Sequence, residues 1–191
     1  MQSLRTLLNS MINLSDSEWQ LFIDCLQTQN VAAKSQLVEA GAIAKHIYFI
    51  EEGLFRTYRI ENGKEISTYF SCDGQAISCF SSFITQSPST EYLQALEDSK
   101  TYSLSYQNLQ KLYKVSQQFE ALSRLFAEQN YLCILNRSHT MQTKTAKEKY
   151  EEFLNKYAPK IIQRVPQHQL ASYLGVAPES LSRIRKELSI S

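Results

Sequence analysis

The spacing typical of metal and disulfide sites is missing from this sequence of 191 residues. Its four cysteines and three histidines are widely separated: Cys25, Cys72, Cys79, Cys133, His46, His139 and His168. Metal sites and small disulfide scaffolds usually show tighter patterns, such as C-x2-C. We therefore expect reduced, mostly buried thiols and neither a metal nor a cofactor. A redox or iron–sulfur role for the cysteines is the alternative.

Long apolar runs and catalytic motifs are also missing. No stretch approaches the roughly 20 apolar residues of a membrane span, and the opening MQSLRTLLNSMINLSDSEW lacks the apolar core and cleavage site of a signal peptide. We expect a cytoplasmic protein that does not contact a membrane. The chain has no glycine loop for phosphates, no nucleophile elbow and no acid–base constellation, so we expect no enzymatic activity.

Charge is nearly balanced overall but unevenly distributed. Residues 1–136 carry ten Lys/Arg and fourteen Asp/Glu, a net charge of −4, whereas residues 137–191 carry ten and five, a net charge of +5. A basic C-terminal segment on a mildly acidic body is typical of a part that binds a polyanion.

The stretch from about residue 30 to residue 104 predicts a β-rich unit. Four of the five glycines of the chain lie at turns between its short β-rich runs, at Gly41, Gly53, ENG 61–63 and CDG 72–74. Asn62-Gly63 favours a type I′ turn, so RIENGKEI predicts a hairpin. Many short strands with close turns indicate a small antiparallel barrel or jelly roll.

Helical periodicity appears on both sides of this unit. SDSEWQLFIDCLQ opens with the capping box Ser15-x-x-Glu18 and keeps apolar helical spacing to Leu26, and NLQKLYKV predicts a short helix. A long helix is expected at 116–141. Its spacing fits packing on its own domain and on a second copy, with a helix that only caps the barrel as the alternative. A hinge is expected at QTKT, and AKEKYEEFLNKYAP predicts a helix ended by Pro159.

The segment QHQLASYLGVAPESLSRIRKEL has the pattern of a helix-turn-helix. The small Ala171 lets two helices cross closely, and Gly175 makes the turn between them. Pro178 suits the first turn of the second helix, where Glu179 also favours the helix dipole. The apolar positions that lock the pair are Leu170, Leu174, Val176, Leu181 and Ile184. The alternative is a helical hairpin with a solvated charged face.

Positions of this motif that packing does not use are candidates for DNA contact. The early part of the second helix of a docked helix-turn-helix enters the major groove. Arg183 can pair bidentately with guanine and Glu179 can accept from a cytosine amine, whereas further cations and hydroxyls suit phosphates. The DNA-binding candidates are Gln167, Glu179, Ser180, Ser182, Arg183, Arg185 and Lys186.

The order helix, β-roll, long helix, helix-turn-helix resembles the CRP/FNR family of bacterial transcription regulators over nearly the whole chain. KSQLVEAGAIAKHIYFIEEGLFRTYRIENGKEISTYF resembles the family's cyclic-nucleotide-binding β-roll, and VPQHQLASYLGVAPESLSRIRKEL resembles its DNA-binding motif. Glu179 and Arg183 match two base-reading positions, whereas Pro178 occupies a third that is often arginine. The resemblance implies a homodimer through the long helix that places two readers about one DNA turn apart. Its implied partners are double-stranded DNA, RNA polymerase and a small-molecule effector.

Two departures limit the resemblance. The family's phosphate-binding cassette, a Gly-Glu pair, a short helix and an Arg-Ser pair, corresponds here to ISCFSSFITQSPSTEYLQAL, and no basic residue lies between Lys64 and Lys100. Without a guanidinium to offset desolvation, and with Glu91 repelling a phosphate, we do not expect cyclic AMP in the usual mode. The sequence also ends three residues after Leu188, so we expect no full β-hairpin wing.

The effector cavity, if there is one, is expected near the cassette. Its candidates are Phe70, Phe80, Phe83, Thr90 and Glu91. The aromatic residues among them are interpreted first as barrel core, with an empty cavity or a site for a neutral or apolar ligand as alternatives.

Together these patterns predict an α+β fold. A cyclic-nucleotide-binding-like jelly roll, or double-stranded β-helix, forms an effector-sensing domain at 1–115, followed by the dimerisation helix at 116–141 and the helix-turn-helix domain at 142–191. We expect a DNA-binding transcription regulator. The alternative is a ligand-binding or protein-interaction module with a vestigial helix-turn-helix.

Overall fold

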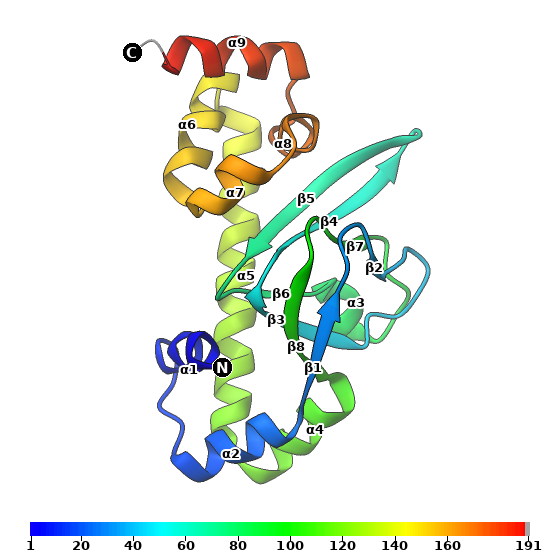
Figure 1. The fold of residues 1–191 in the computed structure, drawn as a ribbon, viewed down its shortest axis with the longest axis vertical. Helices are drawn as coiled ribbons and strands as arrows, with labels where there is room; N and C mark the ends of the chain where they lie inside the picture. The colour runs from blue at the N-terminus through cyan, green and yellow to red at the C-terminus, as the bar shows by residue number, and fades with distance from the viewer. Residues whose placement is uncertain (190–191) are drawn as a thin grey trace.

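A computed structural model describes residues 1–189 as a β-roll, a long central helix and a C-terminal group of helices (Figure 1). The helices are α1 (Gln2–Asn9), α2 (Asp16–Asp24), α3 (Phe80–Thr85), α4 (Tyr106–Val115), α5 (Gln117–Thr143), α6 (Ala146–Lys156), α7 (Pro159–Arg164), α8 (Gln167–Leu174) and α9 (Pro178–Ser189). The strands are β1 (Leu26–Val31), β2 (Gln36–Val38), β3 (His46–Glu52), β4 (Leu54–Glu61), β5 (Lys64–Cys72), β6 (Ala76–Ile77), β7 (Tyr92–Ala95) and β8 (Ser99–Ser105). Within these residues, none of the helices has both the length and the apolar character needed to traverse a bilayer.

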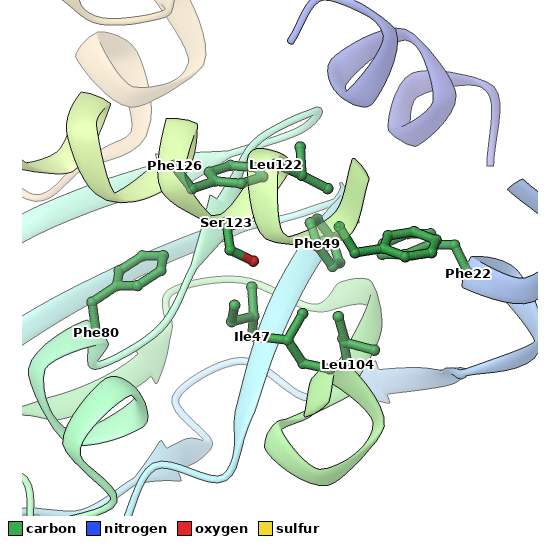
Figure 2. A pocket seen from close by; sticks show the side chains of 10 residues that line it. Phe22, Ile47, Phe49, Phe80, Leu104, Leu122, Ser123 and Phe126 are labelled. Atoms are coloured by element: carbon green, nitrogen blue, oxygen red, sulfur yellow. The ribbon is translucent and has the colours of Figure 1, made fainter. Parts of the chain in front are cut away.

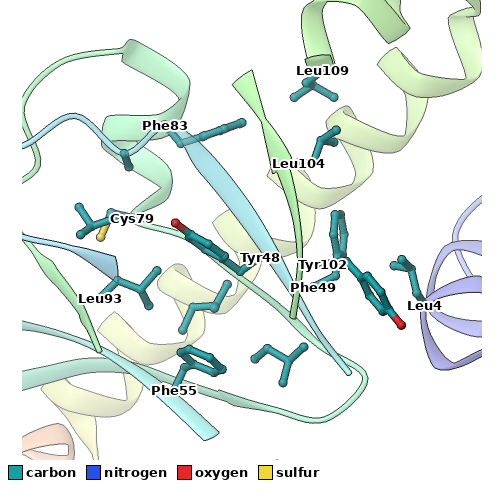
Figure 3. Close-up of a cluster of buried hydrophobic side chains, with 14 of the residues drawn as sticks. Leu4, Tyr48, Phe49, Phe55, Cys79, Phe83, Leu93, Tyr102, Leu104 and Leu109 are labelled. Carbon is teal, nitrogen blue, oxygen red and sulfur yellow. The ribbon is translucent and has the colours of Figure 1, made fainter. Parts of the chain in front are cut away.

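The strands form two four-stranded antiparallel sheets, in the orders β1-β8-β3-β6 and β2-β7-β4-β5. One hydrophobic cluster takes residues from both, so the sheets pack against each other over a common core. Figure 3 shows side chains of this cluster, among them Tyr48, Phe55 and Leu93. The predicted jelly roll is therefore confirmed.

The hairpin of β4 and β5 extends from the roll toward α8 (Figure 1). Its tip has positive φ at both Asn62 (51°) and Gly63 (76°), as the predicted type I′ turn requires. Further along, Thr57 pairs with Tyr69 and Tyr58 pairs with Ser67. Thr68 between them has no partner in the ladder and forms a β-bulge. Because β5 is the edge strand of its sheet, the backbone at this bulge is open to other elements, while the Thr68 hydroxyl bonds to that of Thr57 on β4 (2.7 Å).

The helices follow the sequence patterns closely, with two corrections. The capping box at Ser15 and Glu18 is present, but α2 ends at Asp24 and Leu26 already begins β1. Pro159 does not end α6, which stops at Lys156; it is the first residue of α7. Proline is preorganised for that first helical position, so it starts a helix as readily as it prevents one from continuing.

The buried apolar residues form two clusters. The first fills the β-roll and includes residues of α1, α2, α4 and the beginning of α5. The second lies among α6, α7, α8 and α9 and also includes Leu54, Phe70 and Cys72 of the β4–β5 hairpin. The C-terminal helices are therefore packed directly on the β-roll. They are not connected to it by α5 alone.

We predict that Gly53→Ala destabilises the β-roll. Gly53 joins β3 to β4 with a φ of 144°, and a Cβ there would overlap the Ser99 side chain and lie 3.1 Å from its Cα. Strain and overlap together should lower the free energy of unfolding by about 2 kcal/mol, measured by urea denaturation. Gly63→Ala is the control, since its φ is 76° but a Cβ would meet open space. Equal losses in both variants would contradict the crowding at Ser99.

Candidate nucleic-acid interface and effector cavity

The helix-turn-helix geometry depends on Gly175. Its φ of 64° closes the end of α8, where its own N–H donates to the Ser172 carbonyl (3.2 Å) and the Val176 N–H donates to the Ala171 carbonyl (3.1 Å). A Cβ at Gly175 would lie 2.5 Å from Cε of Met141 on α5. Glycine is therefore favoured at the turn by its positive φ, whereas the flexible end of Met141 can move to admit a Cβ.

The second helix, α9, is held by its apolar side. Leu181 is fully buried and Ile184 nearly so, in the cluster shared with α6 and α8. An ion pair between Lys147 of α6 and Glu187 of α9 (2.5 Å) adds a surface contact. The predicted packing positions of the motif therefore hold the two helices as expected.

Four of the DNA-binding candidates lie on one side of α9. An α-helix turns roughly 100° per residue, so positions i, i+3, i+4 and i+7 share a face. The exposed residues at this spacing are Glu179, Ser182, Arg183 and Lys186. We call them the α9 stripe. Leu181 and Ile184 lie on the opposite side, so the stripe faces solvent along the length of the helix.

The other three candidates lie around this stripe. Ser180 is half-buried and Arg185 exposed, each on a flank of α9. Gln167, the first residue of α8, donates through Nε2 to the Pro178 carbonyl (3.3 Å) and so joins the starts of the two helices. The structure thus brings all seven candidates to one end of the molecule, with Gln167 in a positioning contact.

A cavity of 580 Å³ lies between the β-roll and α5. Volumes of about 300–1,000 Å³ are typical of small-molecule sites. The side of α5 that lines it has helical spacing: Phe126, Gln129, Asn130, Cys133, Ile134 and Arg137. From the roll come residues of α1, the hairpin and the cassette region: Leu7, Thr57, Arg59, Thr68, Tyr69, Gln75, Ala76, Ser78, Phe80, Ser81 and Glu91.

The predicted effector-pocket residues are only partly gathered here. Phe80 and Glu91 line the cavity. Phe70 lies in the second cluster, with its ring 5.4 Å from that of Tyr173, Phe83 is buried in the roll, and Thr90 is exposed. Two sequence patterns could have indicated other lining residues of the cavity: the helical spacing on α5, and the alternation of Thr57 and Arg59 on β4.

The expectation that this site lacks a guanidinium is wrong. Arg59 and Arg137 both line the cavity, although neither lies in the stretch between Lys64 and Lys100. Nε of Arg59 is 3.5 Å from the Glu91 carboxylate. Sequence distance misled the prediction because β4 pairs with β7, which begins right after Glu91, and because α5 crosses the roll.

A second space in the roll is small and apolar. It has a volume of 20 Å³, enough for about one water-sized sphere. Figure 2 shows its walls, with Leu122, Ser123 and Phe126 of α5 opposite Ile47 and Leu104 of the roll. Such a space is a packing defect of the core, so the larger cavity is the candidate site.

Two cysteine thiols that form no disulfide lie close to these regions. Cys79, before α3, is buried, and desolvation raises the pKa of its thiol to about 11. Cys133 lines the cavity, half-buried, with its Sγ 3.5 Å from Nζ of Lys156. Burial likewise raises the pKa of the Tyr69 hydroxyl in the cavity wall to about 12, so this phenol stays neutral at pH 7.

Arg137 connects the cavity with the helix-turn-helix. Its Nη1 donates to the Thr68 carbonyl (2.7 Å), and its Nη2 donates to the carbonyls of Ser67 (3.4 Å) and Tyr173 (3.0 Å). The guanidinium carbon lies 4.3 Å from the centre of the Tyr173 ring. One side chain of α5 therefore holds the bulge in β5 and the end of α8 at the same time.

The edge of β5 is covered by α8 as well. The Ser67 N–H donates to Oγ of Ser172 (3.1 Å). Next to this contact, the hydroxyls of Tyr157 and Tyr173 are 2.6 Å apart, and burial raises the pKa of Tyr157 far above its ordinary value. These contacts leave the middle of β5 bonded to the C-terminal helices.

An ion-pair cluster joins α7 to the turns of the β-roll. Nζ of Lys160 lies 2.7 Å from both Asp73 and Glu97, and Arg164 lies 2.8 Å from Glu97. Burial alone would raise the pKa of the Glu97 carboxyl, but its hydrogen bonds to Lys160 and Arg164 lower it overall. We call Asp73, Glu97, Lys160 and Arg164 the interdomain ion cluster.

The face of α5 opposite the cavity is apolar and exposed. Its residues Tyr131, Leu132 and Leu135 are 51–65% accessible, and Ile134 (60%) lies at its border with the cavity. Contiguous apolar surface of this kind marks interaction sites in folded proteins. Since the cavity side of α5 already packs on the roll, this face is available to a second chain.

Comparison with known proteins places these features in a class. Residues 28–116 match the cyclic nucleotide-binding domain family. A roll of this family followed by a long helix and a helix-turn-helix is the architecture of CRP/FNR transcription regulators, and the predicted resemblance to them is confirmed. No curated protein matches the chain by sequence.

Individual regulators share the fold over most of the chain. The c-di-GMP-responsive regulator CLP of Xanthomonas campestris is 16% identical, with 92% of each chain covered and a TM-score of 0.69. FixK2 of Bradyrhizobium japonicum is 16% identical, covering 86% of this chain and 85% of its own, with a TM-score of 0.75. The catabolite activator protein of Thermus thermophilus is 17% identical, covering 96% and 86%, with a TM-score of 0.59. At these identities the comparison establishes the fold.

We predict that Lys160→Gln loosens the C-terminal helices from the β-roll. The change leaves Asp73 without a cation and Glu97 with Arg164 alone, so backbone amides of β5 and α8 should exchange faster, and the free energy of unfolding should fall by about 1 kcal/mol. Hydrogen–deuterium exchange followed by mass spectrometry measures the first effect. Lys114→Gln, an exposed change on α4, is the control. Unchanged exchange in β5 and α8 would show that the interdomain ion cluster does not hold the two parts together.

Proposed function

We propose that this chain is a DNA-binding transcription regulator of the CRP/FNR type that acts as a homodimer. Its role is regulatory and not catalytic, and it is exercised in the cytoplasm, where DNA and RNA polymerase are its macromolecular partners. The β-roll and α5 form the effector-sensing part. Binding of cyclic AMP in the usual mode is not part of the proposal.

The α9 stripe is the single observation that carries the proposal. Glu179, Ser182, Arg183 and Lys186 face solvent directly opposite the side that packs. This is how a recognition helix presents side chains to the major groove.

Dimerisation through α5 would bring in the second recognition helix, which comes from the other chain. The exposed apolar face of α5 is the surface that a second copy would bury. A two-fold symmetric dimer binds a two-fold symmetric operator, with half-sites about ten base pairs apart.

Regulation is proposed to act through a two-state hinge near 137–145. The helix α5 ends at Thr143, Lys144 is extended, and Thr145 caps α6. An effector in the cavity would contact both the roll and α5 and would lie beside Arg137, which binds α8. Such an effector would change the placement of the two recognition helices.

The alternative is a ligand-binding or protein-interaction module with a vestigial helix-turn-helix. The large cavity supports this alternative, because a small-molecule site can serve a ligand-binding module as well as a DNA-binding regulator. Salt separates the two: a DNA reader loses affinity steeply as salt rises, in proportion to its phosphate contacts.

Selection from a random duplex pool tests the proposal directly. The purified protein, at moderate salt and without added ligand, should enrich a palindromic motif. Enrichment of no motif, with or without candidate ligands, would favour the module without DNA binding.

We predict that Arg183→Ala weakens operator binding by about 1–3 kcal/mol and relaxes preference at one base pair of each half-site. The change removes a side chain that lies in the middle of the α9 stripe and packs on nothing in the roll. Fluorescence anisotropy on selected and singly substituted duplexes measures both effects. Arg124→Ala, which removes the same charge from a surface pair with Glu128 on α5, is the control. Uniform weakening on all duplexes would mean that Arg183 contacts phosphate and does not read a base.

We predict that Leu135→Glu converts the dimer to monomers. The side chain is 51% exposed in one chain, and a second copy of α5 would bury its charge against apolar residues. Light scattering after gel filtration gives the mass, and operator affinity should fall because one half-site is lost. Val115→Glu, 60% exposed at the end of α4, is the matched control. A dimer that survives Leu135→Glu would place the interface elsewhere.

A further inference from the structure

The cavity beside α5 differs in character at its two ends. Phe126 and Arg137 on α5 are eleven residues apart and so about 16 Å apart along the helix. Phe126 and Phe80 form one wall together, since both also border the small apolar space of the roll. Around Arg137 lie Thr68, whose carbonyl it binds, and Thr57, whose Oγ1 is 2.7 Å from that of Thr68. A ligand along α5 would therefore meet an apolar end and a cationic end.

The cationic end has unused hydrogen-bonding capacity. Nε of Arg137 is buried and has no partner among residues 1–189. Arg59 has its Nε 3.5 Å from Glu91, a long contact, and its side chain is 46% exposed. A buried charged donor without an acceptor is costly, and an anion bound in the cavity beside Arg137 would remove that cost.

The cassette itself offers little to a phosphate. Its buried hydroxyls are already engaged with backbone carbonyls: Ser78 with His46, Ser82 with Ser87 and Ser89 with Glu91. The free donors instead come from β4 and α5. With Glu91 also in the wall, the cavity has two cations and one anion, which suits a ligand with one negative charge.

We propose that the cavity binds an organic monocarboxylate with an unbranched apolar chain. The carboxylate lies between Arg59 and Arg137, and the chain extends toward Phe80 and Phe126. This inference rests on the proposed function only in taking the cavity as the effector site, and it names the class of effector. Because Arg137 also donates to the Tyr173 carbonyl, a bound carboxylate draws on the same guanidinium that holds α8.

Calorimetric titration of the full chain with octanoate tests this inference without DNA. We expect saturable binding, one octanoate per chain, and affinity for octan-1-ol lower by roughly tenfold or more because the alcohol has no charge for the arginines. Arg59→Gln should weaken octanoate binding by roughly tenfold or more. Arg124→Gln on the exposed side of α5 should leave it unchanged. Arg137→Lys, which keeps the charge but loses the forked donors, should also weaken binding, with thermal melting showing that the chain is folded.

Each other result overturns the inference. Absence of octanoate binding, equal affinity for octan-1-ol, or no effect of Arg59→Gln would each exclude a carboxylate site between the arginines. Cyclic AMP that displaces octanoate and binds more tightly would assign the site to a nucleotide. If octanoate does not bind but a DNA motif is enriched, the proposed function stands and the carboxylate site is excluded. If octanoate binds but no DNA motif is enriched, the carboxylate site stands and the proposed function is excluded.

Discussion

The arrangement of this molecule depends on one guanidinium group. Arg137 donates to the Ser67 and Thr68 carbonyls of the β-roll and to the Tyr173 carbonyl of α8, and it stacks on the Tyr173 ring. The β-bulge at Thr68 makes this possible, because it leaves two successive carbonyls of an edge strand without ladder partners. The planar fork of Arg137 directs several donors at acceptors that lie apart, whereas the three donors of a lysine ammonium all start from one nitrogen.

The hinge beyond Arg137 is also held by polar contacts. Glu152 of α6 accepts from Nζ of Lys144 (2.6 Å) and from Oγ1 of Thr140 (3.0 Å), and the hydrogen bond from Lys144 lowers the pKa of its carboxyl. Together with the interdomain ion cluster, these contacts surround the apolar contact that Leu54, Phe70 and Cys72 of the hairpin make with the C-terminal helices. The junction is therefore held by charge, by hydrogen bonds and by buried apolar surface.

Local signals in the sequence were sufficient for much of the fold. The capping box at Ser15, the type I′ turn at Asn62-Gly63 and the turn at Gly175 each depend on residues within a few positions of one another, and the structure has all three. The α9 stripe followed from helical periodicity in the same way. Pro159 was misassigned because proline is compatible both with the end of one helix and with the start of the next.

The cavity could not be predicted to the same extent. Two of its lining residues, Arg59 and Arg137, are separated by 78 positions (137 − 59) and line the same cavity only because α5 crosses the roll. No pattern in KEISTYF, residues 64–70, indicates a bulge at Thr68, since bulges depend on pairing register, and register is a property of two strands. Phe80 and Glu91 could therefore be predicted as lining residues from the cassette, whereas both arginines lie outside it.

The covered edge of β5 has a consequence for the energetics of motion. While α8 is in place, the Ser67 N–H and the carbonyls beside it are bonded to Ser172 and Arg137. Swinging the C-terminal helices away would uncover an unpaired strand edge, which attracts other chains as well as water. The docked arrangement of α8 on β5 is therefore the one of lower free energy. Moving the C-terminal helices away from β5 costs the free energy of these hydrogen bonds, and docking α8 again restores it.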